Sequence, residues 1–292
     1  MTEPDHEATV ADVIKSALTN SVRRLVEHEE GVTAGGDPED VHQARVATRR
    51  MRSDLRTFRD FLDPEWTADL RAELEWLGGE LGEVRDVEVM LERLRSDARQ
   101  LPDSEHEGAE RVIRRLIADW HGARARIVEE LATRRYRALR ARLTEASDHP
   151  RVTPWALLRA RDALPAVVRK PWKQLRKEVD GLGDVPADEA LHAVRIRAKR
   201  ARYAAESTIT VFGKPARRFA RAVEGVQEVL GEHQDAVVAQ AWLTKTAGEC
   251  SAPEAFAAGM MAAIEANAGH RARAEFPDVW ASARRPELRA WL

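Results

Sequence analysis

Two short segments of the sequence carry histidine and basic residues at the same helical spacing. The first runs from His42 to Arg52 and the second, 150 residues further on, from His192 to Arg202. Both read His-x-x-Arg-x-x-x-basic-x-x-Arg. Because residues of an α-helix advance by about 100° each, this spacing gathers them in one stripe on one face. The stripes comprise His42, Arg45, Arg49, Arg52 and Arg56, and then His192, Arg195, Lys199 and Arg202.

Such a stripe suits a linear chain of phosphate groups. A guanidinium offers a planar fork of donors that matches phosphate oxygens and stays charged at neutral pH. Like-charged helical neighbours cost about 0.2–0.5 kcal/mol per pair, yet no acidic residue occurs from Ala44 to Ser53 or from Ala193 to Ala205. A solvated charged face is the ordinary explanation for a run of charges, but solvent imposes no repeated spacing. We therefore interpret the stripes as a polyanion-binding surface.

A second motif repeats at nearly the same offset. Leu81 to Asp86 reads LGEVRD, and Leu230 to Asp235 reads LGEHQD. Two matches in the same order indicate two copies of one four-helix unit, which we place at residues 1–150 and 151–292. We expect Asp86 and Asp235 to orient arginine or histidine side chains by hydrogen bonds within each copy.

The elements that must position these stripes are helices. Apolar residues recur at helical spacing, for example at Leu70, Leu74, Leu77 and Leu81, and strand-like alternation is absent from the sequence. Only 13 Pro and 16 Gly interrupt 292 residues, of which 43% are hydrophobic and 33% charged. This composition predicts an all-α fold of about eight long helices, with one long surface helix between Glu105 and Arg142.

Overall charge and cysteine content limit the function and the compartment. The net charge is −2, so a basic site must come from segregation of charge. Cys250 is the only cysteine, which excludes an intrachain disulfide and favours a reducing compartment. The N-terminal residues lack the pattern of a signal peptide, and no apolar run approaches the ~18 residues of a membrane span. We predict a cytoplasmic protein.

Taken together, the motifs resemble the CHAD (conserved histidine α-helical domain) family across nearly the whole chain. The resemblance is carried by residues 41–58, 81–94, 134–139, 191–206 and 230–243. It implies two four-helix bundles related by a pseudo-twofold axis, with a basic cavity or groove between them. It also implies binding of inorganic polyphosphate and, as in some members, association with polyphosphate granules.

On the matching positions, the resemblance places the histidines and basic residues of both stripes in that cavity. Further candidates at equivalent or nearby positions are Arg23, Lys173, Lys177, Lys214, Arg218 and Tyr136. Many relatives carry an additional triphosphate-tunnel domain, for which this sequence has no room, so we expect a stand-alone binder. Because protonated His42 and His192 would add charge, we expect tighter binding as the pH falls toward 6.

Two other kinds of partner remain open. Nucleic acid offers the same phosphate chemistry, but a single-strand binder would carry stacking aromatics, and only Phe58 and Tyr203 interleave the stripes. An acidic protein could also dock on the basic stripes of a helical scaffold. We favour polyphosphate over both.

We expect neither catalysis nor a cofactor or metal. The sequence has no glycine-rich phosphate loop, and Cys250 has no nearby histidine motif. Each copy offers one histidine and one aspartate to a metal, with arginines one helical turn away, and that is a poor environment for a cation.

Overall fold

The computed structural model describes residues 8–35 and 37–292, and within these ranges no β-strand forms. Two isolated bridges, Thr9 with Arg159 and Leu62 with Val152, tie loop segments together. The predicted all-α fold is confirmed. The helices are α1 (Val10–Ala34), α2 (Pro38–Thr57), α3 (Pro64–Ala98), α4 (His106–Leu131), α5 (Arg134–Asp148), α6 (Ala160–Asp180), α7 (Asp188–Glu206), α8 (Ile209–Phe212), α9 (Lys214–Ala247) and α10 (Ala252–Ala283). Four short 3₁₀ turns, Arg59–Phe61, Asp103–Glu105, Pro154–Leu157 and Pro286–Arg289, lie between or after them.

Proline and capping side chains set where the helices near the site begin. Asp37 caps α2 by accepting a hydrogen bond from the Glu39 N–H, and Pro38 follows as the first helical residue. Asp63 and Pro64 start α3 in the same way. A proline at the first helical position loses no hydrogen bond, and the cap satisfies a free N–H, so these Asp-Pro pairs define the helix starts.

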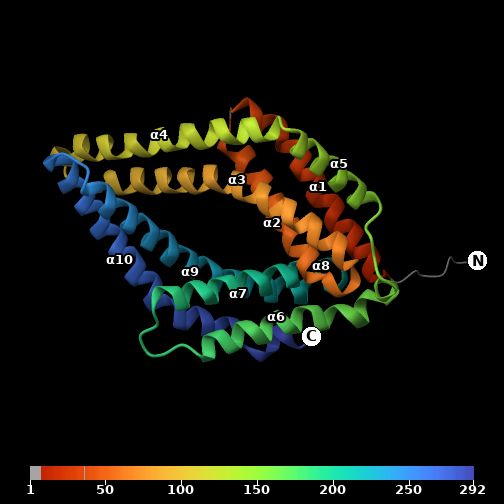
Figure 1. Cartoon of the computed structure of the whole chain (residues 1–292). Helices are drawn as coiled ribbons and strands as arrows, with labels where there is room; N and C mark the ends of the chain where they lie inside the picture. The colour runs from red at the N-terminus through yellow and green to blue at the C-terminus, as the bar shows by residue number, and fades with distance from the viewer. Residues whose placement is uncertain (1–7, 36) are drawn as a thin grey trace, which may run out of the picture.

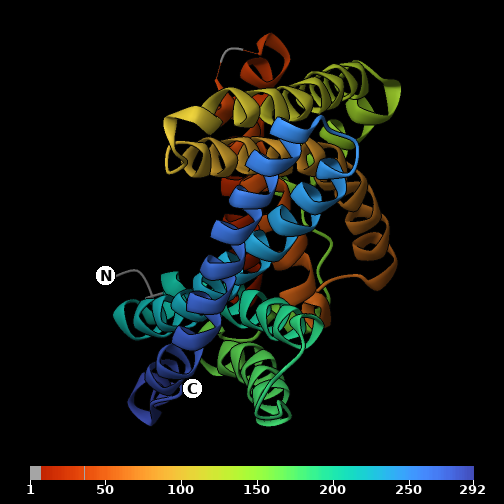
Figure 2. The same ribbon diagram turned by 90° about the vertical axis from the view of Figure 1, so that its left-hand side faces the viewer.

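Two long helical hairpins, α3–α4 and α9–α10, and the crossing of α2 and α7 form the framework of the molecule, which we call the frame. Helices α3 and α4 run side by side toward one end of the molecule, and α9 and α10 converge on the same end (Figures 1 and 2). Their distal parts share one apolar core that includes Leu94, Val112, Leu243 and Met261. At the other end α2 contacts α7, so the two halves of the chain meet at both ends of the frame.

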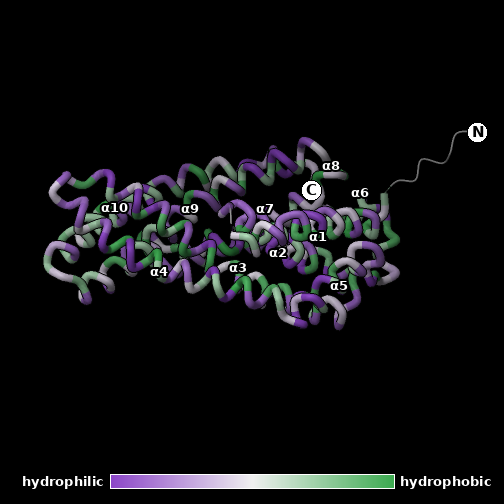
Figure 3. Tube along the Cα trace, turned by 90° about the horizontal axis from the view of Figure 1, so that it is seen from above, coloured by the Kyte–Doolittle hydropathy of each residue, from purple (hydrophilic) through white to green (hydrophobic). Residues whose placement is uncertain are grey.

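Two further apolar cores hold each half together. The first half buries α1, α2, α3 and α5 around residues such as Met51, Leu77 and Tyr136. The second half buries α6, α7 and α9 around Trp172 and Phe219. Seen from above, hydrophobic and hydrophilic residues are interspersed along the helices, as amphipathic packing requires (Figure 3).

The segment between Glu105 and Arg142 is not one helix, and that prediction was wrong. α4 ends at Leu131, and Thr133 starts α5 by accepting a hydrogen bond from the Tyr136 N–H. The side-chain cap offers the backbone an alternative to continuing the helix. The division of the chain at residue 150 and the pseudo-twofold relation of its halves stay predictions. Within the described ranges, none of the helices combines the length and apolar character that crossing a bilayer needs.

Candidate anion-binding site

A cavity of about 410 Å³ lies between α2, α3, α7 and α9, in the middle of the frame. We call it the central cavity. Its walls carry two carboxylates, Asp86 and Asp235, and three valines and a methionine. Six basic side chains and one histidine face these groups, namely Arg45, Arg49, Arg85, Arg93, Arg195, Lys199 and His42. Positive charge therefore outnumbers negative charge in a space shared by both halves of the chain.

The two repeated motifs meet in this cavity. Arg45 on α2 places its guanidinium on α3, where its Nη2 atom lies 3.0 Å from Asp86 Oδ1. Gly82 makes this approach possible, because a Cβ atom there would collide with the Arg45 guanidinium. Gly82 thus leaves space for the Arg45 guanidinium, and Asp86 holds it against the neighbouring helix by an ion pair.

The second copy repeats this arrangement less tightly. Arg195 Nη2 lies 3.9 Å from Asp235 Oδ1, and its guanidinium would come within 3.5 Å of a Cβ atom on Gly231. Each aspartate thus forms an ion pair with an arginine of its stripe, and the 3.9 Å contact of Asp235 is too long for the hydrogen bond that we expected. Arg195 Nε is buried and has no hydrogen-bond partner among the described residues, so this arginine has unused donor capacity.

Arg49 and Lys199 are the basic groups of the cavity that lack a carboxylate. Neither forms an ion pair with any residue that the structure describes, although Arg49 lies over the Tyr203 ring at 5.5 Å from its centroid. Burial first, and then the charges of Arg195, Arg49 and Arg45, lower the pKa of Lys199 to about 8. An anion bound beside this amine would offset both its burial and the neighbouring positive charges.

The two histidines differ in their placement. His42 lines the cavity, and burial followed by the charge of Arg85 lowers its pKa, so it is neutral at pH 7. His192 lies behind the wall, with its Nδ1 atom 2.7 Å from Oε1 of Gln234. His42 therefore adds little positive charge to the cavity of the free protein at pH 7.

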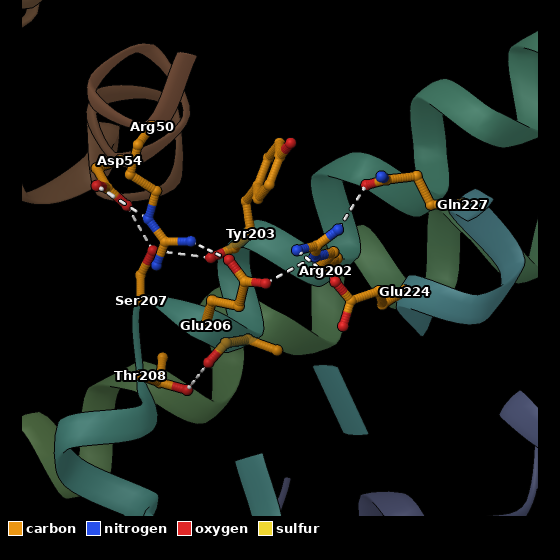
Figure 4. Close-up of polar contacts among 10 residues, drawn as sticks. Arg50, Asp54, Arg202, Tyr203, Glu206, Ser207, Thr208, Glu224 and Gln227 are labelled. Atoms are coloured by element: carbon orange, nitrogen blue, oxygen red, sulfur yellow. Dashed lines mark hydrogen bonds and ion pairs between the residues drawn. The ribbon is translucent and has the colours of Figure 1, made fainter. Parts of the chain in front are cut away.

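The ends of both stripes leave the cavity and enter ion pairs. Arg52 lies 2.7 Å from Glu75 on α3. Arg202 contacts Glu206 and Glu224 at 2.6 Å each and donates to Gln227 (Figure 4). Glu206 also binds Arg50, which ties α2 to α7. These arginines are matched by carboxylates and hold helices together.

The family of the chain follows from a match that covers most of this frame. The family model of the CHAD domain matches residues 16–244, which include both stripes and both LGE motifs. The chain belongs to the CHAD family.

Two curated CHAD relatives and two solved structures agree with this assignment. The uncharacterized proteins MT2285 and Rv2226 of Mycobacterium tuberculosis are each 31% identical in an alignment 291 positions long that covers 92% of this chain. The chain spans about half the length of these relatives, 53% in each case.

The solved structures share the helical fold. PptA from Streptomyces chartreusis superposes with a TM-score of 0.79 at 21% identity, covering 94% of this chain and 99% of its own. The CHAD domain from the plant Ricinus communis gives a TM-score of 0.69 at 27% identity, covering 99% of this chain and 94% of its own.

Several residues predicted to join the CHAD cavity do not line the central cavity. Arg52 and Arg202 are held in the ion pairs above, and Arg56 lines a different cavity. Tyr136 is 2% exposed and belongs to the first core. Residues on outer faces of α1, α6 and the start of α9 are exposed and do not line the central cavity, namely Arg23, Lys173, Lys177, Lys214 and Arg218. An offset of 150 residues identifies equivalent positions in the repeat, but it does not determine whether a residue faces the cavity or the solvent.

Two arginines of α3 were missed. Arg85 and Arg93 line the cavity together with Val89, at positions i, i+8 and i+4 of one helix face. Arg85 lies within the repeated LGE motif, so the spacing that revealed the stripes could have revealed this row as well. Arg93 is partly neutralised, since it binds Glu265 at 2.5 Å and Glu232 at 2.7 Å.

The described part of the chain offers no ready metal site. No group of three or more histidine, cysteine, aspartate or glutamate side chains is arranged there to hold an ion. The carboxylates of the central cavity face arginines instead, as the 3.0 Å contact of Asp86 with Arg45 shows.

Proposed function

We propose that this CHAD protein binds inorganic polyphosphate in the central cavity and does not turn it over. The observation that carries the proposal is the pair of unmatched cations, Arg49 from α2 and Lys199 from α7, in a cavity whose other basic groups outnumber its two carboxylates. Burying charge without a partner is costly, so the arrangement favours a ligand that supplies negative charge.

A chain of phosphates fits the distribution of the donors. The cavity receives basic groups from four helices, so no single phosphate could contact all of them. A polymer with a charge on each unit can contact Arg45 and Arg49 on one side and Arg195 and Lys199 on the other. Guanidinium–phosphate bonds are charge-assisted and roughly twice as strong as neutral ones.

Binding without turnover is supported by the chemistry of the lining residues. The cavity contains no serine, threonine, cysteine or tyrosine that could serve as a nucleophile. The carboxylate of Asp86 is occupied by Arg45, so it is poorly placed to activate water. Storage of polyphosphate or targeting to polyphosphate granules needs only binding.

Nucleic acid is the main alternative ligand, and the lining residues disfavour it. Single-strand binders stack bases on exposed aromatic rings. No aromatic residue lines the central cavity, and Tyr203, the nearest ring to Arg49, is 6% exposed. The cavity therefore offers contacts to phosphates but none to bases.

A calorimetric titration with long-chain polyphosphate at about 0.15 M salt tests the proposal, with single-stranded DNA and orthophosphate as competitors. We expect saturable binding that neither competitor displaces, and a steep loss of affinity with added salt. Equal displacement by DNA would replace the proposal with a general polyanion binder. An absence of binding would favour a helical scaffold for an acidic protein.

A further inference from the structure

A second basic cavity lies on the other side of α7, and the central cavity does not account for it. It has a volume of about 350 Å³ and lies between the end of α2, the turn Arg59–Phe61, α6 and α7. It shares no lining residue with the central cavity. We call it the lateral cavity. Its basic lining residues are Arg56, Arg59, Lys170, Arg197 and Arg200.

Some of these charges are matched and others are not. Arg59 lies 3.4 Å from Asp60, and Arg197 lies 3.0 Å from Glu178. Arg56 and Arg200 form no ion pair with any described residue. Glu75, the acidic residue whose charge reaches Arg56, is already bound to Arg52. The unmatched charge therefore sits at the junction of α2 and α7.

A third unmatched arginine, Arg71 of α3, does not line the cavity but adds to its positive potential. Arg71 also has no ion pair among the described residues, and its charge acts on both Arg56 and Arg200. The Nε atoms of Arg71 and Arg200 are buried without a hydrogen-bond partner. Buried polar groups are almost always hydrogen-bonded, so two adjacent exceptions call for a missing acceptor.

The titration behaviour of the group agrees with this geometry. Burial, and then the charges of Arg200 and Arg71, lower the pKa of Arg56 to about 10. Burial, followed by Arg197 and Arg71, also lowers the pKa of Arg200. The guanidiniums of Arg56 and Arg200 are still charged at neutral pH, so their mutual repulsion persists in the free protein.

The rest of the lining distinguishes this cavity from the central one. Its wall includes Phe61, Val167, Pro171 and Tyr203, with Gln174 and Ser53 as neutral polar groups. Sites for small molecules combine apolar surface with placed polar groups, at volumes from about 300 Å³. No aromatic residue lines the central cavity, so the rings of Phe61 and Tyr203 are what distinguishes the lateral cavity for a ligand with an apolar part.

We propose that the lateral cavity is a separate site for a compact phosphorylated molecule with an apolar part. Its phosphoryl group would bind Arg56 and Arg200, and its apolar part would pack on Phe61 and Val167. This proposal does not depend on polyphosphate binding in the central cavity, because the two sites have no residue in common.

The test uses phenyl phosphate as the probe, with inorganic phosphate for comparison, in titrations of the full chain. We expect phenyl phosphate to bind more tightly than inorganic phosphate. The double variant Arg56→Gln/Arg200→Gln should lose at least about tenfold in phenyl phosphate affinity, because each charge-assisted bond contributes about 1.5–3 kcal/mol. Arg169→Gln, an exposed position on the same α6 helix, should leave the affinity unchanged.

A melting curve of the double variant shows whether the loss is local. Removing two mutually repelling charges should leave the melting temperature equal to or above that of the parent. Polyphosphate affinity should also be retained, whereas Arg49→Gln/Lys199→Gln should retain phenyl phosphate binding. No binding of phenyl phosphate, or binding that is the same in the double variant, would overturn the proposal. A loss of polyphosphate affinity in Arg56→Gln/Arg200→Gln would overturn it too, since the lateral cavity would then extend the central site.

Discussion

The basic residues of α2 and α7 look alike in sequence but lie in two different environments. In the second half of both helices, Arg49 and Lys199 line the central cavity without an ion-pair partner among the described residues. On the same helices, Arg50 and Arg202 are bound to Glu206, which belongs to α7 (Figure 4). The first environment has excess positive charge, and the second is balanced.

This difference separates binding residues from structural ones. An arginine whose carboxylate lies on the next helix fixes the position of that helix, and removing either partner leaves a partly buried charge unmatched. An arginine without a partner destabilises the free protein and is stabilised by an anionic ligand. Spacing along the helix cannot reveal which role applies, because the partners come from other parts of the chain.

Charge reversal in the central cavity should have the largest effect. Arg49→Glu/Lys199→Glu should weaken polyphosphate binding by at least about a hundredfold, since two favourable contacts become repulsive. The melting temperature should not fall, because both side chains repel their neighbours in the parent. Arg23→Glu/Lys173→Glu, exposed on α1 and α6, changes the total charge equally and should alter the affinity only slightly. Equal losses in both double variants would show that only net charge matters.

The balanced region should respond in the opposite way. Glu206→Gln leaves Arg50 and Arg202 without a shared carboxylate, so we expect a loss of about 2 kcal/mol in the free energy of unfolding. Urea denaturation measures this loss, and polyphosphate affinity of the folded variant should stay within about threefold of the parent. If the variant kept its stability but lost polyphosphate binding, Glu206 would act in binding and not in holding the helices together.

The fold and half of the site were predictable from the sequence for one reason, which is helical periodicity. Leu70, Leu74, Leu77 and Leu81 are all buried as their spacing indicates. The same rule brought Arg45 and Arg195 to the cavity. It could not show that Glu75 binds Arg52, because that contact depends on how α3 packs against α2. Nor could an offset of 150 residues tell inner from outer helix faces, and Arg23 and Lys173 are exposed residues that do not line the central cavity.

The unmatched charge of Lys199 predicts a pH dependence. Because its pKa in the free protein is about 8, raising the pH from 7 to 9 removes the charge and should weaken polyphosphate binding by about threefold to tenfold. Bound phosphate favours the charged amine, so complex formation near pH 8 should take up protons. Titrations in buffers of different ionisation enthalpy measure this uptake. Lys199→Arg keeps the charge and should abolish both effects; their persistence in that variant would assign them to another group.

The glycine of the LGE motif offers the finest test. Gly82→Ala places a methyl group against the Arg45 guanidinium, which must move away from Asp86. We expect polyphosphate affinity to fall by about twofold to fivefold, while helix propensity raises stability by up to about 1 kcal/mol. Gly79→Ala on the same helix has no atom within 4 Å of the added methyl group and should change stability alone. Identical affinities for the two variants would show that Gly82 does not position Arg45 for polyphosphate binding.

Chemical footprinting of lysines tests the central claim most directly, because it asks whether polyphosphate covers Lys199. With its pKa of about 8, Lys199 should react readily with an acylating reagent in the free protein, and Lys173 and Lys177 on exposed α6 serve as internal references. Mass spectrometry of each peptide gives the rates with and without saturating polyphosphate. We predict strong protection of Lys199 and little change at the two references. Equal rates at Lys199 in the free and saturated protein would show that polyphosphate does not bind in the central cavity.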